Sequence, residues 1–398
     1  MELNKVVIVG AARTAFDKFG GPLKTTPTVQ LAKVASIEAM KRAGVAPEEV
    51  EEYYLGINMP TANRSIARQA ALEAGIPEYR NSLTVDRACC SSFAAIAMAY
   101  RAIAMGEATI TMGGGAENMS NVPYFLPDLR WGKRLGNITL NDIMIVSCPY
   151  TGEPRAVQAG KGAVKYGVTR EEQDQWALRS QQLYAKAAAE GKFAEEIVPF
   201  VIPNKKGDII VDKDQSPRPD TTIENLRKLK TVYGSPTVTA GNAPGLSTGS
   251  AMVVLMNGEE AEKRGIKPLA TIVSHAQGSG HPDGITDMPG YTALKALKKA
   301  NLTIDQIDLI EINEAFAVMP LVSTIVMAQG DQELLAKLRE KTNVNGGAIA
   351  IGHPTGATAA RLVMTAAMEM RRRGGGYALV TICGGIGEAE CMILKVEP

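Results

Sequence analysis

Cys89 stands where a catalytic thiol is often found. It follows an expected strand at residues 82–86 and a short turn, and it opens an Ala-rich segment that reads as a helix. A helix N-terminus carries partial positive charge and free N–H groups, which favour a thiolate. The pattern therefore indicates a nucleophile, with packing of a small buried side chain as the alternative. The neighbouring Cys90 would point elsewhere and is expected to pack.

His353 is the residue that could activate this thiol. Pro354 suits the first turn of a helix expected over residues 354–373, which places His353 near its N-cap. His353 holds roughly the same position in the second α/β repeat as Cys89 holds in the first. We therefore expect the two helix starts to meet, and a cysteine facing a histidine is an activated nucleophile. The alternative is an ordinary polar residue of a loop or core.

Cys383 and Asn313 each end an expected strand. Glycines follow Cys383, and their N–H groups could point at a developing oxyanion. Asn313 could position a water molecule, or it could only form an Asx turn or cap a helix. His275 and His281 flank a Gly- and Ser-rich loop and are expected to be surface or loop residues.

These residues lie on two similar α/β units. The order of strand, loop, helix, glycine and strand in the first part returns from about residue 269. Such alternation implies a largely parallel sheet with helices on its faces. Two copies are buried naturally as two stacked sheets that share a helical layer, so the expected fold class is a duplicated α/β unit with α-β-α-β-α layers. Strands are expected at 5–13, 53–58, 82–86, 108–114, 269–276, 307–313 and 377–385, and helices at 28–43, 91–105 and 354–373.

Residues 119–243 read as an insertion. They are richer in Pro, Lys and Asp, and they contain one long helical stretch at 169–191, where Thr169 and Glu172 fit a capping box. The expected division is an N-terminal half (1–118 plus 244–268), this inserted loop domain, and a C-terminal half (269–398). Aromatic residues of the insertion could line a ligand pocket or form its small core: Tyr124, Phe125, Trp131 and Tyr150.

The composition excludes several classes of function. The chain has 398 residues with 43 basic and 42 acidic side chains, which argues against a broad nucleic-acid surface. Five cysteines without a CxxC pair, together with three histidines, suit neither a disulfide framework nor a structural zinc site. No apolar run is long enough to span a membrane and no signal peptide is visible, so a cytoplasmic location is expected. The absence of GxGxxG argues against a nicotinamide oxidoreductase.

Seven segments together resemble the thiolases over essentially the whole chain. Members of that family interconvert a 3-oxoacyl-CoA plus CoA with two shorter acyl-CoA molecules. The segments are VDRACCSS (85–92), GGGAENMSNVPY (113–124), YGVTREEQDQWALRSQQ (166–182), TVTAGNAPG (237–245), EINEAFA (311–317), NGGAIAIGHPTGATAAR (345–361) and CGGIG (383–387).

The resemblance implies a role for each candidate. Cys89 would carry the acyl group as a thioester, His353 would activate it, and Cys383 would be the acid and base. Asn313, through a water, would form one oxyanion hole with His353, and the backbone N–H groups of Cys89 and Gly385 would form the other. CoA is implied as a substrate, with no metal or redox cofactor. Its expected contacts are Arg218, Asn225, Leu229 and Pro244.

Several positions depart from the family pattern. Many thiolases carry a His-Met-Gly segment whose histidine lines the acyl pocket, and the corresponding stretch here has no histidine. We therefore expect an acyl chain that is branched, aromatic or dicarboxylic. Arg155 and Lys161 lie in the altered stretch and could pair with a distal carboxylate. The other departures are Ser92 for glycine, Pro244 for serine, and Ile386 and Glu388 in the final Gly-rich turn.

Alternatives remain open at this point. One is an acetoacetyl-CoA-forming acetyltransferase, and another is a thiolase-like subunit that binds acyl-CoA and needs a helper subunit. A ketoacyl synthase of the same fold is disfavoured because those enzymes do not keep a second catalytic cysteine like Cys383. By analogy with the family, a homodimer or homotetramer is expected, with the edge of the first sheet pairing across a two-fold axis.

Overall fold

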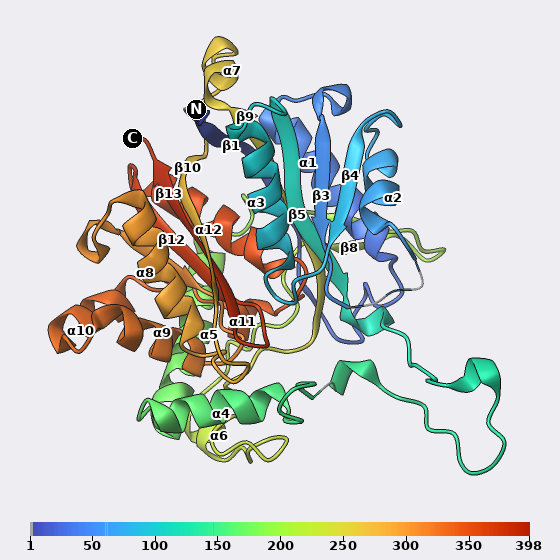
Figure 1. The fold of residues 1–398 in the computed structure, drawn as a ribbon, viewed down its shortest axis with the longest axis vertical. Helices are drawn as coiled ribbons and strands as arrows, with labels where there is room; N and C mark the ends of the chain where they lie inside the picture. Colours follow the sequence, from blue (N-terminus) through green and yellow to red (C-terminus); the bar gives the residue numbers. More distant parts are fainter. Residues whose placement is uncertain (1–2, 60, 62, 146) are drawn as a thin grey trace.

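The computed structural model describes residues 3–59, 61, 63–145 and 147–398 (Figure 1). The strands are β1 (Val6–Thr14), β2 (Asp17–Lys18), β3 (Glu52–Gly56), β4 (Asn81–Val85), β5 (Ile110–Asn118), β6 (Ile197–Val198), β7 (Phe200–Ile202), β8 (Ile209–Val211), β9 (Ser247–Asn257), β10 (Ala270–Ser279), β11 (Leu309–Ile312), β12 (Gly376–Cys383) and β13 (Glu388–Val396). The α-helices are α1 (Thr28–Ala43), α2 (Ile66–Glu73), α3 (Ser91–Ala104), α4 (Arg155–Lys165), α5 (Arg170–Ala189), α6 (Ile223–Arg227), α7 (Gly258–Lys263), α8 (Met288–Ala300), α9 (Val318–Ala328), α10 (Gln332–Glu340), α11 (Ala348–Ile351) and α12 (Thr358–Arg372).

The first half of the chain builds a mixed sheet with the strand order β4-β3-β5-β9-β1. Strands β3, β4 and β5 are parallel, whereas β9 runs antiparallel to both β5 and β1. The second half builds β11-β12-β13-β10, in which only β11 and β12 are parallel. Each half is therefore mixed, and the expectation of a largely parallel sheet was wrong. Strand β13 follows β12 through a short loop and so enters antiparallel, whereas β9 follows the long insertion and also runs antiparallel to both its neighbours.

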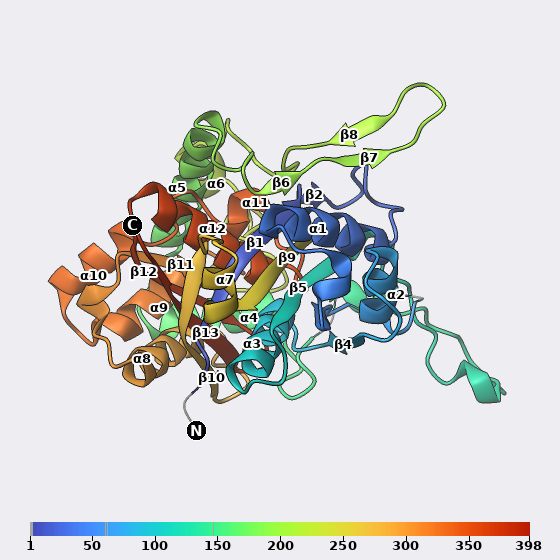
Figure 2. The same ribbon diagram turned by 90° about the horizontal axis from the view of Figure 1, so that it is seen from above.

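The two half-sheets join along one edge. Strands β1 and β10 pair antiparallel at only two positions, Val7 with Thr271 and Ile8 with Ala270. This short contact links all strands except β7 and β8 into one 11-stranded sheet. The sheet bends at the junction, and the two halves enclose α3 and α12 between them (Figures 1 and 2).

The layers are those expected of a duplicated α/β unit. Side chains of α3 and α12 pack in one core with strands of both halves. Helices α1 and α2 cover the outer face of the first half, and α8 covers the outer face of the second. The order is therefore α-β-α-β-α. Helix α12 is buried from Thr358 to Met370, which is the pattern of a helix surrounded by protein.

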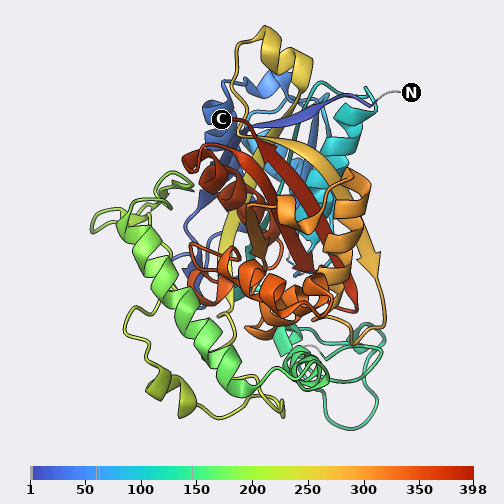
Figure 3. The same ribbon diagram turned by 90° about the vertical axis from the view of Figure 1, so that its left-hand side faces the viewer.

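The insertion contributes α4, α5, α6 and the β7–β8 ribbon. Helix α5 begins with the expected capping box at Thr169 and Glu172 and lies beside the second half (Figure 3). A long segment between β5 and α4 extends away from the body (Figure 1). Four aromatic residues of the insertion are exposed and so do not form its small core, whereas their lining of a ligand pocket stays a prediction: Tyr124, Phe125, Trp131 and Tyr150.

Candidate active site

A tight turn between β4 and α3 presents Cys89. The N–H of Cys90 donates to the carbonyl of Arg87, and the N–H of Ser91 donates to that of Ala88. Ala88 has φ +48°, in the left-handed region that non-glycine residues rarely adopt. Such strain is often found at functional sites, and here it places Cys89 at the tip of the turn, one residue before the N-cap of α3.

His353 lies against this thiol. Its Nε2 is 3.3 Å from the Sγ of Cys89. On the other side of the ring, Nδ1 is 2.7 Å from Oγ1 of Thr358. That hydroxyl donates to the carbonyl of Pro354 at 2.9 Å, so its oxygen accepts from Nδ1–H. The proton therefore belongs on Nδ1, and the lone pair of Nε2 faces the thiol.

The position of His353 in its loop differs from expectation. Helix α12 begins at Thr358 with Ala357 as its N-cap, so His353 lies in the loop between α11 and α12. The N–H of His353 donates to Oγ of Ser247, at the start of β9. An X-Pro pair disfavours helix at the residue before proline, but here the turn Pro354–Ala357 also stays outside the helix.

The surroundings of both reacting groups favour their neutral forms. Burial lowers the pKa of His353 to about 3, and the nearby Arg361 adds to the effect. Burial likewise raises the pKa of the Cys89 thiol, the Cys383 thiol raises it further, and Arg155 opposes the shift. Desolvation thus opposes the thiolate expected near a helix N-terminus, which stays a prediction. Cys89 can become a nucleophile by passing its proton to Nε2 of His353 as it attacks.

Asn313 approaches Nε2 of His353, the ring nitrogen that also faces Cys89. Its Nδ2 is 3.3 Å from Nε2 of His353. Its Oδ1 is buried and has no partner among the described residues. A buried amide oxygen is seldom left unpaired, so a bound water or substrate atom is the natural partner. The placement suits the predicted oxyanion-hole water, which stays a prediction.

Cys383 ends β12 beside the nucleophile turn. Burial raises its pKa to about 11, while the N–H of Gly385 works in the opposite direction. Gly384 packs closely on the turn, because a Cβ there would lie 3.0 Å from Sγ of Cys90. Cys90 itself is fully buried, which agrees with a packing role. The structure thus gathers Cys89, His353, Asn313, Cys383 and Gly385 around one point, and their catalytic roles stay predictions.

Glu117 is a residue that the sequence analysis missed. It is buried at the end of β5 and accepts hydrogen bonds from Thr355 Oγ1 at 2.9 Å and the N–H of Gly356 at 3.1 Å. It also accepts from the N–H of Asn58 at 3.1 Å. Burial raises its pKa to about 7. This carboxylate anchors the loop that carries His353, and an acid at the end of a buried Gly-rich strand was the available signal.

Arg87 is a second missed residue. Its guanidinium contacts both oxygens of Glu388 at 3.1 Å and one oxygen of Glu390 at 2.6 Å. The other oxygen of Glu390 is 2.7 Å from Nε2 of His275. His275 is therefore buried in β10, and its placement at the surface was wrong, whereas His281 is exposed. The network ties the turn before Cys89 to the strand after Cys383.

Glu314 is structural. Its two oxygens accept from Trp176 Nε1 at 2.8 Å, Ser180 Oγ at 2.7 Å and Asn343 Nδ2 at 3.0 Å. The N–H of Ile349 adds a fourth bond at 3.1 Å. These contacts join Glu314 to α5, to α11 and to the loop before α11. They therefore also hold Asn313, which directly precedes Glu314 in the sequence.

The four expected CoA contacts fall into two groups, three around α6 and one near the catalytic residues. Arg218 and Asn225 are exposed, and Leu229 is partly exposed around α6. Pro244 is near the site, because Ser247 three residues later contacts His353. All four stay predictions.

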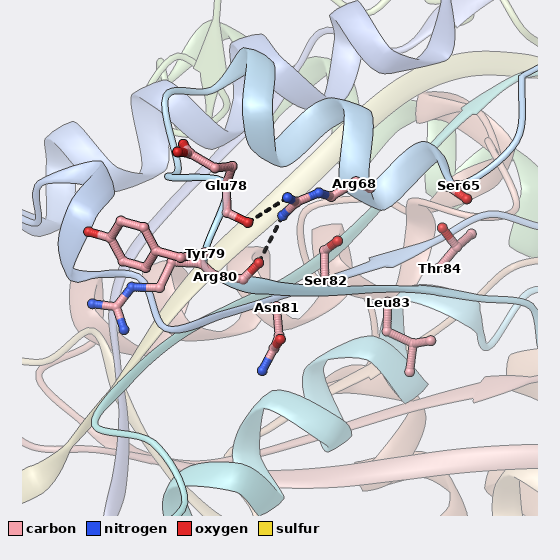
Figure 4. A pocket seen from close by; sticks show the side chains of 9 residues that line it. All are labelled: Ser65, Arg68, Glu78, Tyr79, Arg80, Asn81, Ser82, Leu83 and Thr84. Carbon is pink, nitrogen blue, oxygen red and sulfur yellow. Dashed lines mark hydrogen bonds between the residues drawn. The ribbon is translucent and has the colours of Figure 1, made fainter.

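A surface pocket lies away from these groups. It is a shallow hollow of about 570 Å³ at the outer edge of β4, where Arg68 donates to the carbonyls of Glu78 and Arg80 (Figure 4). None of its lining residues belongs to the catalytic group. Within the described part of the chain, no cluster of His, Cys, Asp and Glu side chains could hold a metal ion, and no helix is long and apolar enough to cross a membrane.

Comparison with known proteins agrees with this geometry. The thiolase N-terminal domain matches residues 6–259 and the thiolase C-terminal domain matches residues 266–396. An acetyl-CoA acetyltransferase of Syntrophomonas wolfei is 42% identical, with 98% of this chain and 99% of the relative covered. A beta-ketoadipyl-CoA thiolase of Pseudomonas knackmussii is 39% identical, with 98% and 99% covered.

A solved structure shares the fold. The crystal structure of the Bacillus anthracis acetyl-CoA acetyltransferase has a TM-score of 0.93 and 36% identity, with 99% of each chain covered. The two family domains together span nearly the whole chain, and the relatives are similar over their full length. Both findings assign the chain to the same family. The chain belongs to the thiolase family and is an acyltransferase of the thiolase type.

Proposed function

We propose that the protein cleaves a 3-oxoacyl-CoA with CoA, reversibly, through an acyl group carried on Cys89. The observation that supports this most is the contact of 3.3 Å between Cys89 Sγ and His353 Nε2, with Thr358 holding the ring proton on Nδ1. A neutral thiol facing a neutral imidazole is a nucleophile paired with its base.

The proposed steps use five groups. Cys89 attacks the 3-oxo carbonyl while its proton passes to Nε2 of His353. The resulting oxyanion accepts hydrogen bonds from the protonated ring and from a water molecule whose other hydrogen is held by the unpartnered Oδ1 of Asn313. The C2–C3 bond then breaks, and Cys383 protonates the departing enolate of the shorter acyl-CoA. The Cys383 thiolate next takes the proton of CoA, whose sulfur attacks the acyl-Cys89, and His353 returns the proton to Cys89. The N–H groups of Cys89 and Gly385 are the proposed second oxyanion hole.

We further propose an acyl chain other than the acetoacetyl one: branched, aromatic or dicarboxylic. Two departures support this proposal: the altered stretch at 148–167, which includes α4, and Pro244, close to the His353 loop. One relative is named a beta-ketoadipyl-CoA thiolase. The second candidate is an acetoacetyl-CoA-forming acetyltransferase, favoured by the name of the relative that is 42% identical.

Intact-protein mass spectrometry tests the proposal. The enzyme and its Cys89→Ala variant are mixed with 3-oxoacyl-CoA compounds of acetoacetyl, long-chain, branched, aromatic and dicarboxylic types. We expect an acyl adduct that is lost in Cys89→Ala, with the strongest labelling from one non-standard chain. Comparable turnover of acetoacetyl-CoA and all longer analogues would contradict the chain proposal. No adduct with any compound would favour the remaining alternative, an acyl-CoA-binding subunit that needs a partner.

The proposed assembly is a homodimer or homotetramer that works without metal or redox cofactor in the cytoplasm. Strand β4 ends the sheet, and Leu83 on it and Tyr79 before it are exposed, which suits pairing with a second copy across a two-fold axis. Trp131 and Leu135 on the projecting segment are 90% and 84% exposed, which suits a further contact between copies. Sedimentation of the wild type against Trp131→Glu and Leu83→Glu variants tests which surface joins the subunits.

A further inference from the structure

One cation of α4 differs from the other two. Lys161 pairs with Glu153 at 2.5 Å, and Lys165 pairs with Asp287 at 2.9 Å. Arg155, at the start of the helix, has no carboxylate within 4.0 Å among the described residues. Its Nη1 donates to Oε1 of Gln158 at 2.8 Å, and its side chain also bonds to that of Cys148. A half-buried arginine without a carboxylate partner is unusual, because its charge is partly desolvated.

Arg155 faces the catalytic group. Its Cζ and Nε both lie 3.9 Å from the point that a Cβ of Gly385 would occupy, and Cβ of Ala88 lies 3.8 Å from the same point. The guanidinium therefore sits between the turn that carries Cys89 and the loop that follows Cys383. Burial raises the pKa of both thiols, and the charge of Arg155 is among the effects that lower them.

Neighbouring residues hold the arginine in place. Gln158 is fully buried, and its Nε2 donates to Oδ1 of Asp283 at 2.8 Å and approaches Oγ1 of Thr151 at 3.2 Å. Its Oε1 is thereby fixed toward Arg155. A positioned guanidinium that no carboxylate engages is preorganised to bind one by two parallel hydrogen bonds.

We propose that Arg155 binds a carboxylate at the far end of the acyl chain, so that the enzyme prefers dicarboxylic 3-oxoacyl-CoA substrates. The inference rests on the proposed thiolase function and selects one of its three chain types. The phosphates of CoA are unsuitable partners, because the pantetheine arm separates them from the thioester by far more than the reach of one side chain. The acyl group is the part of the substrate that lies beside both reacting sulfurs.

The test compares two substrates of equal length, 3-oxoadipyl-CoA with its terminal carboxylate and the uncharged 3-oxohexanoyl-CoA. The wild type should prefer the dicarboxylic compound in kcat/KM. Arg155→Gln should lower kcat/KM for that compound by roughly 10- to 100-fold, mainly through KM, and leave the uncharged compound little changed. Arg155→Lys should recover part of the preference, since it keeps the charge without the fork. Lys165→Gln, on the same helix and with its exposed ammonium group engaged by Asp287, is the matched control and should keep the wild-type preference.

The possible outcomes distinguish failure of the proposed role of Arg155 from failure of the proposed thiolase function. Equal loss for both substrates in Arg155→Gln would show that the arginine acts on the reacting atoms, and it would overturn the inference while the thiolase function stands. A wild type that prefers the uncharged compound would also overturn it. Failure of the wild type to cleave either compound, or acetoacetyl-CoA, would instead contradict the proposed function. Thermal unfolding identifies any variant that fails to fold. If Arg155→Gln is one of them, the substrate preference of Arg155→Lys tests the proposal instead.

Discussion

Replacing Arg87 by methionine should weaken the link between the two halves of the active site. Arg87 contacts Glu388 with two bonds of 3.1 Å and Glu390 with one of 2.6 Å. The side chain of Glu390 is 0% exposed and that of Arg87 only 18%. Arg87→Met leaves the buried Glu390 with His275 and a bond of 3.4 Å from Gln277.

The cost follows from that burial. Removing one partner of a buried ion pair costs about 3–5 kcal/mol, and the partial exposure of Arg87 reduces this to about 2–4 kcal/mol of unfolding free energy. Arg264 makes a comparable pair of contacts at the surface, with Glu260 and Glu49. Arg264→Met should cost only about 0–1 kcal/mol and is the control.

The assay is urea unfolding at one fixed protein concentration, since assembly changes apparent stability. It is combined with kcat and KM on a 3-oxoacyl-CoA. Because Arg87 lies two residues before Cys89, we expect kcat to fall by roughly 10- to 100-fold with little change in KM. Arg87→Lys should recover part of both losses. An Arg87→Met variant as stable and as active as Arg264→Met would refute this account of the network.

Three further predictions concern the groups around His353. Alkylation of Cys89 should become steadily faster from pH 6 to pH 9 and be slower in His353→Asn; a rate that is flat over this range would show a preformed thiolate. Gly115→Ala should lower stability by about 1–3 kcal/mol and lower kcat, because a Cβ there would overlap a carbonyl oxygen of the His353 loop, whereas Gly245→Ala meets open space and should be neutral in the same assays. The pKa of Glu117 is raised by burial to about 7 from 4.5, so the folded state holds this proton more tightly and loses stability as pH rises through that window. Relative to Glu117→Gln, the unfolding free energy of the wild type should therefore fall by roughly 1–3 kcal/mol between pH 4.5 and 7, and a rise would contradict the burial argument.

Local signals predicted the elements well. The helix at 28–43 is α1 with those bounds, and the capping box at Thr169 forms as expected. The helix expected at 91–105 is α3, and Gly106 follows it with φ +78°. Periodicity, caps and glycine positions act over a few residues, so they can be interpreted from the sequence alone.

The properties that depend on distant residues could not be predicted. The pKa of Cys89 is set by burial and by Cys383, Arg155 and Glu117, which come from remote parts of the chain. His275 was placed at the surface because its partner Glu390 is 115 residues away. The pairing of β1 with β10 spans only two positions and leaves no periodic signal. The resemblance to thiolases selected the catalytic residues, and the fold explains how they are held.

The most direct test of the central claim is to locate the acyl group. The enzyme is quenched in acid after brief reaction with an isotopically heavy 3-oxoacyl-CoA and digested, and its peptides are sequenced by mass spectrometry. The account predicts heavy acyl on Cys89 in the wild type, none in Cys89→Ala, and a strongly reduced amount in His353→Asn. A heavy acyl group on Cys383, or on any residue in Cys89→Ala, would contradict it.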